Sequence, residues 1–122
     1  MASTYTDAHR NACADALAAL GNRIGLYTAD GVRVGTVYGD TTWGTASKVT
    51  EDGYDWAKKT GSTVALTVPA VTVPNGTVIA KYGVHSGSTL LRTEDLPVSL
   101  VVNDGTQSFS VDVTPILRFR GL

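Results

Sequence analysis

The chain has 122 residues, a length that fits a single domain. Its 10 basic and 11 acidic residues give a net charge of −1, which excludes a global field that attracts nucleic acid or an anionic membrane. One cysteine, Cys13, excludes an intrachain disulfide and a cysteine-built zinc site. Charged residues make up only 17% of the chain, a composition that favours β structure with a small polar surface or a surface covered by neighbours.

The start of the chain predicts neither a signal peptide nor a membrane span. The segment 1–21 lacks a basic start followed by a continuous apolar core. No window of the sequence reaches the roughly 18 apolar residues that a transmembrane helix needs. We therefore expect a protein made and folded in a cytoplasm, beginning with a polar arm at residues 1–6.

A helix is predicted over residues 7–20, capped by Thr6 or Asp7, whose side chain can accept a bond from a free amide of the first turn. Gly21 or Asn22 is expected to end it in a left-handed conformation. The apolar face of this helix consists of Ala8, Ala12, Cys13, Ala16, Leu17 and Leu20, with Arg10 and Asp15 off the stripe. We favour packing of this face on the domain's own sheet, the alternative being a second copy of the helix.

Beyond the helix, short β-rich runs alternate with turn signals. The turn dipeptides are Asp30-Gly31, Gly39-Asp40, Asp52-Gly53, Asn75-Gly76, Ser86-Gly87 and Asp104-Gly105. The predicted strands are Arg23–Thr28, Val32–Tyr38, Thr63–Val68, Thr77–His85, Thr89–Arg92, Val98–Val102, Ser108–Val113 and Ile116–Arg120. This spacing predicts a mainly β fold, an antiparallel β-sandwich or barrel with one N-terminal α-helix. One domain is expected over residues 1–122, with its β region at 23–120, because we find no repeat and no linker.

The middle of the chain has no clean period, and we expect an irregular excursion at residues 40–62 that covers one end of the sandwich. Within it, the run Tyr54–Lys59 can form a helical turn or a strand. Further on, Pro69 and Pro74 each remove a ladder donor, so the segment VPAVTVP is interpreted as an extended edge.

The strand TVIAKYGVH alternates between two faces. One face carries Val78, Ala80, Tyr82 and Val84, and the other carries Ile79, Lys81, Gly83 and His85. Because the second face is the more polar one, His85 is expected on the wetter side, near the end of the strand.

Catalytic chemistry is not indicated, and we expect no enzyme and no cofactor. His85 and Ser86 are neighbours on a predicted strand, so their side chains point to opposite faces. The sequence has no G-x-S-x-G elbow. Cys13 lies on the predicted inner face of the helix, where a thiol is usually inert packing.

Metal binding is also not indicated. The two histidines, His9 and His85, lie far apart in the sequence. Glu51, Asp52 and Asp55 form an acidic cluster of the kind that can bind calcium, but without EF-hand spacing. We interpret this cluster as a solvated loop.

Aromatic residues near the irregular segment give the candidate contact site. Loop aromatics such as Trp43 and Trp56 can stack on sugars or anchor a protein partner, although plugging the sandwich end is the favoured interpretation. The run Arg118–Arg120 predicts a strand with a buried Phe between two outward Arg residues, rather than a reader of RNA. The candidate contact residues are Trp43, Tyr54, Trp56, Arg118 and Arg120.

Four short motifs occur in a characteristic order: DALAALG in the helix, LYTAD directly after it, then TWGTAS and VPNGTVIAKYGVHSG. This order resembles a family of small virion proteins of tailed bacteriophages of actinobacteria, commonly labelled tail or tail-fibre proteins. Some small phage proteins of this general build decorate capsids. The chain departs from the family at Asp30-Gly31, where Asp-Pro is typical, in an acidic insert at Glu51–Trp56, and at His85, where an aromatic is usual.

The resemblance implies a non-enzymatic virion protein, made in the host bacterial cytoplasm and located on the capsid exterior or the tail. Its expected partners are other copies of itself, in a trimer or ring, and the major capsid or tail proteins, with no nucleic acid and no membrane. The alternative function is a receptor- or glycan-binding module that uses the loop aromatics.

Overall fold

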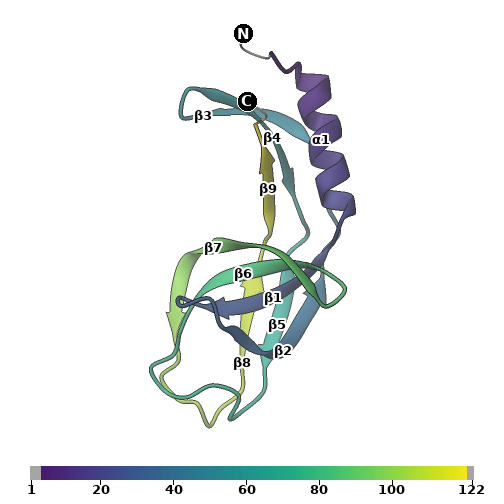
Figure 1. Ribbon diagram of the computed structural model, residues 1–122. Helices are drawn as coiled ribbons and strands as arrows, with labels where there is room; N and C mark the ends of the chain where they lie inside the picture. The colour runs from purple at the N-terminus through teal and green to yellow at the C-terminus, as the bar shows by residue number, and fades with distance from the viewer. Residues whose placement is uncertain (1–3, 121–122) are drawn as a thin grey trace.

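The computed structural model describes residues 4–120, which form one helix and nine strands (Figure 1). The helix α1 spans Asp7–Ala19. The strands are β1 (Arg23–Thr28), β2 (Arg33–Asp40), β3 (Ser47–Glu51), β4 (Tyr54–Thr60), β5 (Val64–Val68), β6 (Val78–Ser86), β7 (Thr89–Val101), β8 (Phe109–Val113) and β9 (Ile116–Phe119). The predicted mainly β fold with one N-terminal helix is confirmed. Of the predicted polar arm, residues 1–3 lie outside the described range.

The strands form three antiparallel sheets, in the orders β2-β1-β6-β7, β5-β8 and β3-β4-β9. The first two sheets pack face to face, and we call them the sandwich. The third sheet carries α1 on one face, and we call this pair the helical lobe. Figure 1 shows the sandwich at one end of an elongated molecule and the helical lobe at the other. Only a few residues separate β4 from β5 and β8 from β9, so two chain segments run through both parts.

The core of the sandwich is built by strict alternation in its two-stranded sheet. Along β5 the buried and exposed residues alternate without a break, and Thr67 on its outer face bonds Ser110 of β8 (3.0 Å). The buried residues of the sandwich core are Ile24, Leu26, Val34, Val64, Leu66, Val68, Ile79, Tyr82, Val84, Val102 and Val113.

A β-bulge in β6 changes the predicted facing of its residues. The register with β1 and with β7 shifts between Ile79 and Lys81. Because one extra residue is inserted there, Ile79 joins Tyr82 and Val84 in the core instead of pointing to the opposite face. His85 does lie opposite Val84 on the strand, but the prediction that it is wetter is wrong, since only 1% of it is exposed.

The helix buries a different face from the one its apolar pattern predicts. Its buried residues are Arg10, Ala14 and Ala18, whereas the predicted inner stripe is mostly exposed, with Leu20 at 57% and Leu17 at 37%. Cys13 on that stripe is only half-buried. Ala14 and Ala18 pack closely on the sheet, and ion pairs flank this contact: Lys59 of β4 binds Asp15 at 2.6 Å, and the buried Arg10 pairs with Asp7 and Asp55.

The two ends of the helix differ in how well the sequence predicts them. Thr6 is the N-cap, accepting a bond from the His9 amide at 3.2 Å. At the C-terminal end, Leu20 keeps right-handed dihedral angles, and neither Gly21 nor Asn22 adopts the predicted left-handed conformation. Gly21 is needed for another reason, because a Cβ there would lie 2.2 Å from the carbonyl oxygen of His85.

The predicted irregular excursion at residues 40–62 is wrong, because most of it forms the β3–β4 hairpin. Asp52 and Gly53 both have positive φ, 55° and 78°, as a tight two-residue hairpin turn requires. The run Tyr54–Lys59 is therefore a strand and not a helical turn. The sequence does not predict these strands because the face that meets the helix carries charged side chains such as Lys59. The alternation of apolar and polar residues that marks a strand is therefore absent.

Three other predicted elements differ in the structure. The VPAVTVP segment leaves β5 and turns, with Val71 at a φ of 63°, instead of continuing as an extended edge. Gly39-Asp40 belongs to β2 rather than to a turn. Glycine is needed at position 39 because a Cβ there would lie 2.4 Å from the Val64 side chain. The predicted strands 89–92 and 98–102 join into β7, in which the four residues Leu96–Ser99 bulge opposite a single residue of β6.

The one helix within residues 4–120 is too short and too polar to cross a bilayer.

Candidate functional site: a groove between the sandwich and the helical lobe

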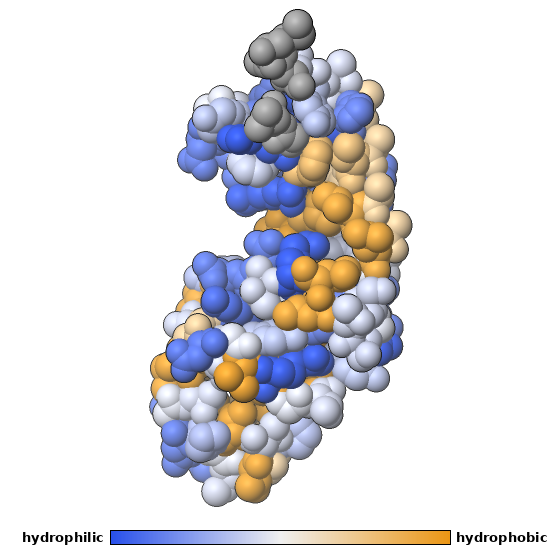
Figure 2. Space-filling view, in the orientation of Figure 1, coloured by the Kyte–Doolittle hydropathy of each residue, from blue (hydrophilic) through white to orange (hydrophobic). Residues whose placement is uncertain are grey.

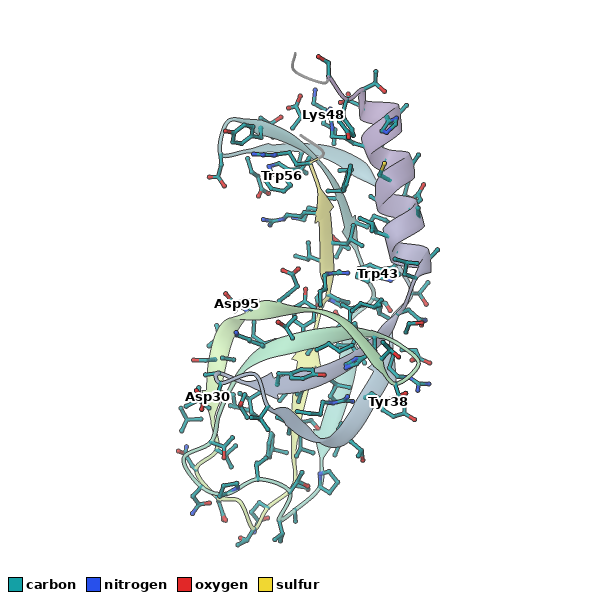
Figure 3. All side chains as sticks on the ribbon, in the orientation of Figure 1. Asp30, Tyr38, Trp43, Lys48, Trp56 and Asp95 are labelled. Atoms are coloured by element: carbon teal, nitrogen blue, oxygen red, sulfur yellow. The ribbon has the colours of Figure 1, made fainter. Side chains whose placement is uncertain are left out.

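A groove of about 420 Å³ separates the helical lobe from the edge of the sandwich. Figure 2 shows it as a notch at mid-height, bordered by hydrophilic side chains. Figure 3 labels Trp56 on the helical-lobe side and Asp95 on the sandwich side. Its principal lining residues are Trp56, Tyr82, Glu94, Asp95, Thr114 and Arg118.

The wall on the helical lobe is the face of the β3-β4-β9 sheet that points away from α1. Alternation on β4 brings Tyr54 and Trp56 to this face, while Ala57 is buried in the core cluster beneath the helix. The indole N–H of Trp56 donates to the carbonyl of Glu51 at 3.1 Å, which fixes the orientation of the ring. Arg118 binds the carboxylate of the same Glu51 at 3.0 Å.

An Arg–aromatic cluster continues this wall beyond the groove. The guanidinium carbon of Arg120 lies 4.1 Å from the ring centre of Tyr54 and 5.8 Å from that of Trp56. Both distances are within cation–π range. The shorter one shows that Arg120 lies closer to Tyr54 than to Trp56.

The opposite wall comes from β7. Glu94 pairs with Arg92 at 3.3 Å, and Asp95 follows it at the groove. At the back of the groove, the Tyr82 hydroxyl accepts from the amide of Ile116 at 2.9 Å and donates to its carbonyl at 3.3 Å. Burial of Tyr82 raises the pKa of this phenol above its usual 10.0. This side chain therefore ties β6 of the sandwich to β9 of the helical lobe.

Four of the five predicted contact residues come together on this face: Tyr54, Trp56, Arg118 and Arg120. The fifth, Trp43, lies elsewhere and packs against both hydrophobic cores. Its indole N–H donates to the carbonyl of Gly21 at 3.1 Å, which places it as a structural link between the two parts.

Glu94, Asp95 and Thr114 were not among the predicted contact residues, because they come from parts of the chain distant in sequence from the aromatic residues. A signal for the first two was present. They form an acidic pair within LLRTEDLPV, which is only a weak signal because charged side chains are also usual on edge strands.

His85 forms part of a separate polar cluster on the outer face of the four-stranded sheet. Its Nδ1 lies 3.0 Å from the carbonyl oxygen of Arg23, and its Nε2 lies 2.8 Å from the Tyr27 hydroxyl and 3.2 Å from Arg33. Because a carbonyl only accepts, Nδ1 carries the proton and Nε2 accepts from Tyr27. Burial lowers the pKa of His85 below its usual value. Both ring nitrogens are thus engaged by the protein itself.

The acidic cluster predicted as a solvated loop separates in the structure. Glu51 faces Arg118, whereas Asp55 lies 3.8 Å from both Arg10 and Lys48. Among the residues that the structure describes, no three metal-ligating side chains come together.

Comparison with protein-family models, with curated proteins and with solved structures found no match to this chain.

Proposed function

We propose that this protein is a non-enzymatic structural subunit of a multi-copy assembly. The setting suggested by the motif resemblance is the virion of a tailed bacteriophage, with the protein decorating the capsid exterior or associated with the tail. Its partners in this proposal are other copies of itself and the major capsid or tail proteins.

The observation that supports this proposal best is the exposed apolar face of α1. The helix uses ion pairs and two alanines to dock on its own sheet, which leaves Leu17 and Leu20 in solvent beside a row of alanines. Figure 2 shows apolar surface along this side of the helical lobe. A contiguous apolar surface on a soluble protein typically marks a contact with another macromolecule.

Sedimentation velocity over a range of protein concentrations tests whether the protein associates with itself. We expect the wild type to associate as concentration rises, and Leu20→Glu to remain monomeric with an unchanged circular dichroism spectrum, because a charge on this face opposes its burial. Val32→Glu is the control, since Val32 is 62% exposed in the turn between β1 and β2, away from α1. A wild type that stays strictly monomeric at the highest concentration contradicts self-assembly.

A second candidate function is a receptor- or glycan-binding module. The observation that favours it is the convergence of Tyr54, Trp56, Arg118 and Arg120 on one face beside the groove. Aromatic rings with an apolar face and a satisfied polar tip are common at binding surfaces.

A further inference from the structure

We propose that the groove between β7 and β9 binds a neutral saccharide chain, with the Trp56 ring as its stacking platform. This inference rests on the second candidate function and gives it a place and a ligand class. The groove volume of about 420 Å³ lies within the range of about 300–1,000 Å³ that is usual for ligand sites.

The charges around the groove favour a neutral ligand. Its charged lining residues are Glu94, Asp95 and Arg118. Glu51 pairs with Arg118, and Glu94 pairs with Arg92. Since both pairs cancel locally and Asp95 is acidic, the groove has no positive field that selects a phosphate or a sulfate.

The Trp56 ring is prepared for stacking. Its only polar atom already donates to the Glu51 carbonyl, so the indole does not need a polar partner from a ligand. The ring is half-buried and held in one orientation, which lowers the entropy lost on binding. A pyranose ring presents a face of C–H groups that fits such an aromatic surface.

The polar lining matches hydroxyl groups. Each carboxylate of Glu94 and Asp95 has several acceptor sites, and the ion pair to Arg92 occupies only part of those on Glu94. Arg118 supplies N–H donors, and the Thr114 hydroxyl can both donate and accept. A sugar hydroxyl also donates and accepts, so neighbouring hydroxyls can be satisfied from both walls.

An extended peptide fits the groove less well, because neither strand edge is free to pair. At the β9 edge, the amide and carbonyl of Ile116 are already bonded to the Tyr82 hydroxyl. At the β7 edge, the bulge at Leu96–Ser99 contains Pro97, which has no amide hydrogen to donate. A regular added strand therefore has no continuous ladder on either wall.

The test is an NMR titration of the full-length, isotope-labelled protein with neutral tetrasaccharides of glucose, galactose, mannose and N-acetylglucosamine. We expect at least one of them to shift the Trp56 indole signal together with the Asp95 and Arg118 amides, with a Kd in the millimolar range. Trp56→Ala and Asp95→Ala should each weaken binding roughly tenfold or more. Tyr38→Ala is the control, because Tyr38 is an exposed aromatic residue that lies under Arg23, outside the groove.

The outcomes separate the ligand class from the binding function. If no tetrasaccharide shifts the groove signals, or if Trp56→Ala binds as well as the wild type, the saccharide proposal is overturned. If an extended peptide shifts the groove signals and saccharides do not, the ligand class is wrong and a binding module remains. Wild-type protein that also fails to bind intact host cells, measured with a fluorescent label, contradicts the second candidate function itself.

Discussion

At the scale of single residues, the most informative side chain is His85, a histidine buried among basic groups. Burial is the main cause that lowers the pKa of His85, and the guanidinium groups of Arg33 and Arg23 lower it further, whereas the hydrogen bond to the Arg23 carbonyl acts in the opposite direction. The carboxylate of Asp40 pairs with Arg23 at 3.4 Å. The folded protein therefore keeps this imidazole neutral down to a lower pH than the unfolded chain does.

This difference predicts a stability that depends on pH. Because folding lowers the pKa of His85, the unfolded chain takes up the proton first as the pH falls through the ordinary value of 6.5. The free energy of unfolding is then highest above that value and decreases toward acid, by about 1.4 kcal/mol for each unit of pKa difference. Urea denaturation at several values between about pH 8 and about pH 5 measures the slope.

The control for this prediction compares substitutions of the two histidines. In His85→Gln the slope should flatten, whereas His9→Gln, which removes an exposed imidazole, should retain it. A slope that is unchanged in His85→Gln contradicts the assignment.

At the scale of elements, the packing of α1 is decided by charge and by side-chain size. Ala14 is completely buried against Ala57 and Leu117 of the sheet, and Ala18 is nearly so. Small residues at these positions bring the helix close enough for Lys59 to reach Asp15. The larger apolar residues of the helix cannot occupy this narrow space, and they lie on the side away from the sheet.

This packing predicts opposite results for two alanine substitutions. Ala14→Leu inserts a large side chain into a filled interface and should destabilise the protein by about 1–3 kcal/mol. Ala16→Leu lies on the exposed face and should change stability by less than about 0.5 kcal/mol in the monomer. Thermal unfolding of both variants at low concentration checks the prediction, and a larger loss in Ala16→Leu would show that the predicted stripe faces the sheet.

At the scale of the whole molecule, the sandwich and the helical lobe have separate hydrophobic cores that are joined at a few points. Trp43 packs on both cores, Tyr82 bonds across to Ile116, and the chain passes between the two parts four times, after α1, β2, β4 and β8. The groove exists only because these contacts hold the two parts at a fixed separation. Any ligand of the groove therefore depends on the relative position of the two parts.

These links predict a single cooperative unfolding transition in the wild type. Trp43→Ala should lower stability by about 3 kcal/mol and should separate the unfolding of the two cores, since it removes packing from both. Near-ultraviolet circular dichroism and amide hydrogen exchange follow the two parts independently. Tyr38→Ala, an exposed aromatic away from the interface, is the control, and coincident transitions in Trp43→Ala would refute this coupling.

Sequence patterns predicted the local parts of this structure well. The limits of β1 are those predicted, β5 and β8 follow their alternation, and Thr6 caps the helix. The β3–β4 hairpin was missed although its Asp52-Gly53 turn was recognised, because the strands carry charged residues on the face that meets the helix. The bulge at Ile79–Lys81 could not be seen, since a one-residue shift leaves no local mark in the sequence.

The sequence by itself determined what depends on neighbours along the chain: where strands alternate, where the chain turns, and where the helix begins. Only the tertiary structure decided which face of α1 is buried, that His85 is enclosed, and that Trp56 and Asp95 line one groove. The physical reason is that these outcomes depend on contacts between residues distant in sequence. The close packing of Ala14 and Ala18 on Ala57 and Leu117 is such a contact, and no periodicity along the chain records it.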